Sequence, residues 1–116
     1  MIHETARDAG VPRDEWVKFF DQFASWNQGR PVRVETFGEE IGDEEVGRRL
    51  PLLSINYDPK GKGDVITIAT GRAGVEYEHA VTGPREVWVE RDASGAGKAM
   101  EIVSEGGIRT VVSFEQ

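Results

Sequence analysis

Two histidines, His3 and His79, are the first side chains to consider for acid–base or metal chemistry, because this chain of 116 residues contains no cysteine. His3 is followed by Glu4, but positions 6 and 7 are Ala and Arg, so the H-E-x-x-H zinc motif is not formed. No second ligand follows His3 at helical spacing. We therefore expect His3 to be inert, and we predict no metal site.

His79 is the better candidate for a functional side chain. Residues 75–81 alternate between apolar and polar types, which predicts a strand with Tyr77 and His79 on its apolar row. A partly buried imidazole with a carboxylate partner acts as a general base near neutral pH. Glu76 and Glu78 fall on the opposite face, so a partner must come from another strand. His79 is either a core histidine or, with Tyr77, part of a pocket.

Other signatures of catalysis or cofactor binding do not match the sequence. Ser94 lies in A-S-G-A-G instead of G-x-S-x-G. The glycine pairs at 61–63 and 95–97 lack the further glycine and the helix of a dinucleotide site, and 58–64 lacks the spacing of a phosphate loop. Carboxylates are plentiful, but no spacing singles out a pair for hydrolysis. We predict no catalytic residue and no cofactor.

Trp88 is the candidate for a contact site. It stands in E-V-W-V-E at 86–90, so Trp88 faces outward if Val87 and Val89 face inward. Tryptophan is enriched among the residues that dominate protein interfaces. Trp88 therefore either anchors a partner or packs under residues 38–49.

Charge and composition restrict the class of partner. The chain has 14 basic and 21 acidic residues, a net charge of −7, and its 38% hydrophobic content is that of a soluble globular domain. Nucleic-acid binders normally present a basic face, so we expect no nucleic-acid partner. No apolar run approaches the ~20 residues of a membrane span, and the first residues do not resemble a signal peptide. We expect a cytoplasmic protein that does not bind membranes.

The segment 12–29 has the strongest helical pattern in the chain. Its aromatic residues are spaced as one face of an amphipathic helix: Trp16, Phe19, Phe20, Phe23 and Trp26. Pro12 suits the first helical position and Gly29 suits the C-terminal cap. Each aromatic ring brings roughly 150–250 Å² of apolar surface. We expect this helix to form the centre of the core.

The rest of the chain reads as short strands joined by turns. The strands are expected at 31–37, 50–57 (with Leu53, Ile55 and Tyr57 in one row), 64–70, 75–81, 86–90, 99–104 and 108–114. The acidic segment 38–49 is expected to be a solvated loop or a single helical turn, with a weak cation or basic-partner site as the alternative.

Together these elements predict an α+β domain at 12–116, preceded by a mobile tail at 1–11. In this domain an N-terminal amphipathic helix packs on a curled antiparallel sheet of six or seven short strands. The element order is similar to that of Sm-like and SH3-like barrels, so a small barrel or roll is expected.

Several motifs resemble one family of proteins: P-R-D-E-W-V-K-F-F-D-Q-F, L-P-L and I-N-Y-D before G-x-G-D, E-H-A-V-x-x-P, and E-G-G-I-R-T-V-V-S-F. They are similar to a family of short bacterial proteins catalogued only as a domain of unknown function, and the likeness runs over residues 11–115. The resemblance implies a small bacterial cytoplasmic domain and transfers no functional residue.

The leading hypothesis is a non-enzymatic domain that acts by protein–protein contact or self-association. Open sheet edges favour pairing, so a dimer is expected at micromolar concentration. The alternative is a small enzyme or ligand-binding barrel with a pocket lined by His79 and Tyr77. A third hypothesis, an RNA-binding Sm-like module, requires a basic rim that this sequence does not supply.

Overall fold

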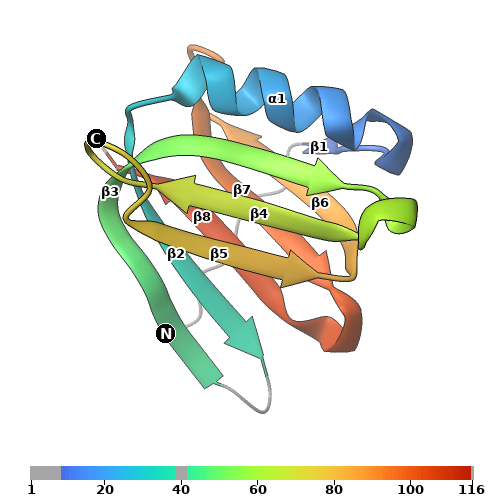
Figure 1. Cartoon of the computed structure of the whole chain (residues 1–116). Coiled ribbons are helices and arrows are strands. Elements are labelled where there is room, and N and C mark those ends of the chain that lie inside the picture. Colours follow the sequence, from blue (N-terminus) through green and yellow to red (C-terminus); the bar gives the residue numbers. More distant parts are fainter. Residues whose placement is uncertain (1–8, 39–41, 116) are drawn as a thin grey trace.

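One helix lies across the mouth of a strongly curled antiparallel sheet (Figure 1). This computed structural model describes residues 9–38 and 42–115. The elements in chain order are β1 (Ala9–Gly10), the 3₁₀ turn η1 (Arg13–Glu15), α1 (Trp16–Asn27), β2 (Pro31–Gly38), β3 (Gly42–Asp58), the 3₁₀ turn η2 (Lys60–Lys62), β4 (Val65–Thr70), β5 (Tyr77–Thr82), β6 (Pro84–Arg91), β7 (Gly97–Ser104), the 3₁₀ turn η3 (Glu105–Gly107) and β8 (Arg109–Phe114).

The sheet is open. Its strand order is β1-β6-β7-β8-β2-β3-β4-β5, every pair is antiparallel, and the two-residue β1 and the six-residue β5 stand at its ends. The expected α+β class, with one helix on a curled antiparallel sheet, is therefore confirmed. Because β5 and β6 are not joined by strand pairing, the described residues form a roll and not a closed barrel.

The acidic segment 38–49 was expected to be a loop or a helical turn, and this expectation is wrong. From Gly42 onward the backbone is strand, paired with β2 through Pro51. Ladder pairing with β2 outweighs the low strand propensity of glycine and glutamate in this segment. Glu39 and Glu40 lie outside the described residues, so the cation or basic-partner site expected there stays untested.

β3 bends because it carries extra residues in both of its ladders. Arg49 has no counterpart in the register with β2, and its φ of 51° places it in the left-handed region. Leu53 is the extra residue in the register with β4. A bulge bends its strand and breaks the two-residue alternation. The buried row is therefore Leu52, Ile55 and Tyr57, and the expected row that began with Leu53 is wrong.

The aromatic face of α1 forms the centre of the core, with one exception. Trp16, Phe20 and Phe23 are at most 1% exposed, whereas Trp26 is 71% exposed. Successive helical residues differ by about 100° in direction. Asn27 occupies the buried direction and donates a hydrogen bond of 2.7 Å to the carbonyl of Phe23. Trp26, one position earlier, therefore turns away from the core.

The N-terminal segment reaches the edge of the sheet before the helix begins. Ala9 and Gly10 pair with β6, and the N–H of Val11 donates to the carbonyl of Val87 at 2.8 Å. Residues 9–11, expected to belong to a mobile tail, are thus part of the sheet edge. Residues 1–8, which include His3, lie outside the described residues.

α1 has 12 residues. Within residues 9–38 and 42–115, no helix has the length and apolar character needed to traverse a lipid bilayer.

Candidate binding groove

β3 changes its strand partners part-way along its length. Residues from Gly42 to Pro51 pair with β2, whereas Leu52 to Asp58 pair with β4. On the side that faces α1, Leu52 donates to the carbonyl of Arg30 and accepts from the N–H of Gly29, each at 2.9 Å. Beyond Leu52, no backbone group of the described residues bonds to β3 on that side. Residues 53–58 therefore form a strand edge inside the fold.

The backbone groups of Ile55 and Tyr57 face this open side. The N–H of Gly71, just after β4, donates to the carbonyl of Pro51 in β3 at 2.9 Å. Backbone direction alternates along an antiparallel strand, so Ala69 and Thr67 also face β3. Their partners in the register are Ser54 and Asn56, which therefore face β4. Ile55 and Tyr57 point the opposite way, and each presents one N–H and one C=O group toward α1.

Two adjoining clefts lie between α1 and this edge, with volumes of about 210 and 340 Å³. Asp21, Ile55 and Asn56 line both clefts, so we treat them as one feature, the α1–β3 groove. The full lining is Asp14, Val17, Lys18, Asp21, Ala24, Ser25 and Gln28 from the helical segment, and Leu53, Ser54, Ile55, Asn56 and Tyr57 from β3.

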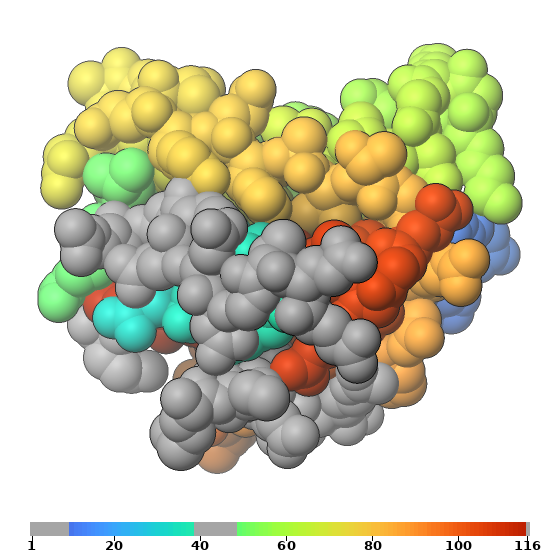
Figure 2. All heavy atoms as spheres, turned by 90° about the horizontal axis from the view of Figure 1, so that it is seen from below, coloured from blue at the N-terminus to red at the C-terminus, as the bar shows by residue number. Residues whose placement is uncertain are grey.

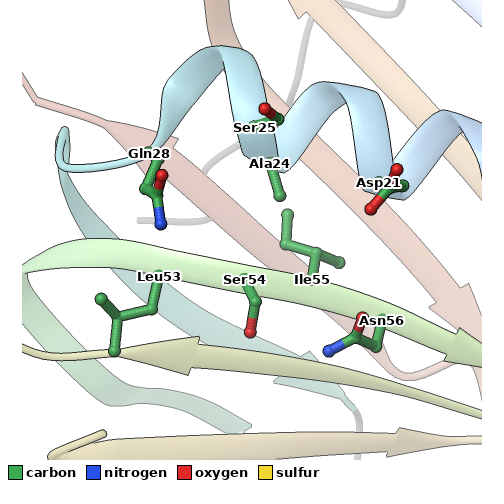
Figure 3. A pocket seen from close by; sticks show the side chains of 8 residues that line it. All are labelled: Asp21, Ala24, Ser25, Gln28, Leu53, Ser54, Ile55 and Asn56. Carbon is green, nitrogen blue, oxygen red and sulfur yellow. The ribbon is translucent and has the colours of Figure 1, made fainter. Parts of the chain in front are cut away.

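Figure 3 shows how side chains divide the space around the groove. Ile55 points toward Ala24, and Gln28, the residue after α1, extends toward β3. Leu53, Ser54 and Asn56 point away from the helix, which leaves the backbone of β3 facing it. Pockets for drug-sized ligands usually measure ~300–1,000 Å³, so the cleft of about 210 Å³ is smaller than this range and the cleft of about 340 Å³ lies at its lower end. Two clefts that share lining residues along one strand suit an extended chain.

A polar cluster fixes one end of the groove: Arg13, Tyr57 and Asp64. Arg13 Nη1 donates to the Tyr57 hydroxyl at 2.8 Å and lies 3.3 Å from Asp64 Oδ1, while its Nη2 donates to the carbonyl of Pro84 at 2.6 Å. The guanidinium also lies over the ring of Trp16, 4.5 Å from its centroid. These contacts tie the start of the helix to β3, β4 and β6.

The cluster positions the start of the helix. Burial, followed by the hydrogen bond to Asp64, raises the pKa of Tyr57 above its ordinary value of 10.0. Sequence analysis missed the cluster because its members are 44 and 51 positions from Arg13. No local spacing signals such a contact.

Tyr77 and His79 lie on the inner face of β5. His79 stands opposite Ile68, which stands opposite Ile55, so the imidazole continues an apolar row. Burial lowers the pKa of His79, and no carboxylate contributes to that shift. Neither Tyr77 nor His79 lines the α1–β3 groove. A pocket at these two residues stays a prediction.

Trp88 lies on the outer face of β6, opposite to the buried Val87 and Val89. Its indole N–H donates to Glu86 at 2.8 Å. Gly10 of β1 lies against the ring, since a Cβ atom at Gly10 would be 3.2 Å from it. A third cleft, of about 310 Å³, lies beside Trp88 and the start of the helix. Contact between Trp88 and a partner stays a prediction.

No group of three or more His, Asp or Glu side chains within the described ranges is arranged to hold a metal ion. The α1–β3 groove itself offers three kinds of contact: backbone donors and acceptors of β3, carboxylate and amide side chains of the helical segment, and a small apolar floor.

Comparison with known proteins places the chain in a family. Residues 7–116 match a family described as "Family of unknown function (DUF5335)". The chain belongs to this family. An "Uncharacterized protein" of Aquifex aeolicus (strain VF5) is 30% identical over 105 residues, which cover 90% of this chain and 89% of that protein. No solved structure matches the chain. The resemblance to an uncharacterised bacterial family is confirmed, and it brings no activity with it.

Proposed function

We propose that this domain is a protein-interaction module that binds an extended segment of another protein as an added strand in the α1–β3 groove. The observation that supports it is the unbonded backbone edge of β3 at residues 53–58, flanked by α1. Addition of a strand to an exposed edge is a recurrent mode of peptide recognition.

The number of exposed backbone groups sets the expected strength of binding. Ile55 and Tyr57 together offer two donors and two acceptors on the groove side. A net gain of roughly 0.5–1.5 kcal/mol for each hydrogen bond amounts to about 2–6 kcal/mol. Such free energies correspond to dissociation constants of tens of micromolar or weaker. The module is therefore expected to form transient complexes.

The experiment is to fill the groove from the helix side. Ser25 is exposed and lines the groove, whereas Gln22 is exposed on the same helix and does not. Binding of a fluorescein-labelled valine–threonine pentapeptide, V-T-V-T-V, is measured by anisotropy. Ser25→Phe should weaken binding at least tenfold, and Gln22→Phe should leave it unchanged. Equal binding by both variants, or no binding by the parent protein, would contradict the proposal.

Self-association through β5 is a second candidate, supported by a separate observation. β5 stands at the end of the sheet, and its six residues pair with β4 without a register shift. Figure 2 shows β5 and the preceding turn along one side of the face opposite α1. A regular edge of this kind accepts a strand from a second copy. Light scattering at micromolar concentration should give the mass of a dimer, and a monomer mass counts against this candidate.

The enzyme alternative, with a pocket at His79 and Tyr77, has its own test. An NMR titration that shows the His79 imidazole accessible, with a pKa raised by a neighbouring carboxylate, would favour it.

A further inference from the structure

The helix side of the α1–β3 groove carries two carboxylates, Asp14 and Asp21. Both residues are exposed, and neither forms a salt bridge with another described residue. Lys18 is the one basic residue in the lining. Asp21 lines both clefts and so lies where they meet. The wall facing the open edge of β3 is thus acidic.

We infer that the segment bound in this groove is basic, with a lysine or arginine side chain that pairs with Asp21. The inference rests on the proposed function, since it names the partner for the same groove. Side chains of an added strand point alternately to its two faces. In a segment that alternates basic and apolar residues, all basic side chains therefore lie on one face of the strand. We assign this basic face to the side that contacts α1.

The net charge of the whole protein also favours a basic partner, but it acts at long range and not through a contact with Asp21. The net charge of −7 attracts any cation from a distance, and this attraction is screened beyond ~10 Å at 0.1 M salt. A direct contact with Asp21 depends on that one residue. Because exposed ion pairs are weak, we expect a preference of only about two- to fivefold for a basic segment.

The test compares three labelled pentapeptides, V-K-V-K-V, V-T-V-T-V and V-E-V-E-V, at 50 mM sodium chloride. The lysine peptide should bind about two- to fivefold more tightly than the threonine peptide, and the glutamate peptide most weakly. Asp21→Asn should abolish most of the lysine preference and leave threonine binding intact. Glu15→Gln removes the same charge from an exposed residue outside the groove, and it should preserve the preference.

The outcomes separate the two proposals. If the threonine peptide binds and the lysine peptide binds no better, the basic partner is wrong while strand addition stands. If Glu15→Gln and Asp21→Asn reduce the preference equally, the attraction is general and the pairing with Asp21 is wrong. If none of the three peptides binds, both proposals fall.

Discussion

The hydroxyl of Tyr57 donates a hydrogen bond of 3.0 Å to the carboxylate of Asp64, and Arg13 lies within hydrogen-bond distance of both. Asp64 has a φ of 53°, a left-handed conformation that aspartate tolerates better than most residues. Tyr57 is a lining residue of the α1–β3 groove. The same hydrogen bonds therefore stabilise the fold and fix the position of a residue that lines the groove.

Tyr57→Phe should lower the free energy of unfolding by about 1–3 kcal/mol, because it removes a hydrogen bond to a charged group and leaves Asp64 with Arg13 alone. Urea denaturation measures the change. A loss below ~0.5 kcal/mol would mean that the cluster does not hold the helix to β3.

The raised pKa of Tyr57 predicts a pH dependence at alkaline pH. Above pH 10, the ordinary pKa of the phenol, the unfolded chain releases the proton while the folded chain retains it. The unfolded state is then favoured, so stability falls as the pH rises through the folded pKa. Ultraviolet titration should show one of the two tyrosines ionising late, and Tyr57→Phe should remove that step.

The lowered pKa of His79 predicts a loss of stability in mild acid. Below pH 6.5, the ordinary imidazole value, the unfolded chain takes up a proton more readily than the folded chain, and stability falls as the pH drops toward the folded pKa. Urea melts between pH 7 and pH 5 measure this effect. It should disappear in His79→Gln and persist in His3→Gln. The same slope in all three proteins would contradict the burial of His79.

Phe23→Ala should cost about 3–5 kcal/mol, since Phe23 is fully buried in the core. Trp26→Ala serves as the control on the same helix. Because Trp26 is exposed, its removal should change the free energy of unfolding by less than ~0.5 kcal/mol. Similar losses in both variants would mean that the helix is rotated from its described position.

Gly97→Ala should destabilise the fold by about 1–3 kcal/mol, since its Cβ atom would lie 2.9 Å from the ring of Phe23. Gly61 has open space around the same position, so Gly61→Ala should be neutral or slightly stabilising. Thermal melts of the two variants compare them directly, and equal melting temperatures would contradict the close contact.

Local pattern accounted for much of the fold. Apolar residues at helical spacing predicted α1, and alternation with glycine turns predicted most strands, because both signals lie within about ten residues. The prediction that Trp26 is buried was wrong. Its spacing matches that of the core-facing residues, but the last turn of the helix buries Asn27 instead. The prediction that Leu53 shares a buried row with Ile55 and Tyr57 was wrong because a bulge at Leu53 shifts the alternation. Such a bulge leaves no local signal in the sequence.

Sequence patterns could not predict the α1–β3 groove, for a different reason. It exists because β3 leaves β2 at Pro51 and continues with β4, while α1 occupies the vacated side. That arrangement depends on pairings between distant segments. In the sequence Asp14 and Asp21 are two of many acidic residues, and only the fold places them beside a strand edge.

Hydrogen exchange of the β3 amides, measured by ¹⁵N NMR with and without saturating V-K-V-K-V peptide, tests strand addition most directly. Exchange at Ile55 and Tyr57, whose N–H groups face α1, should slow at least tenfold on binding. Ser54 and Asn56 face β4 and should change little. Unchanged exchange at Ile55 and Tyr57, or protection confined to β5, would contradict the account.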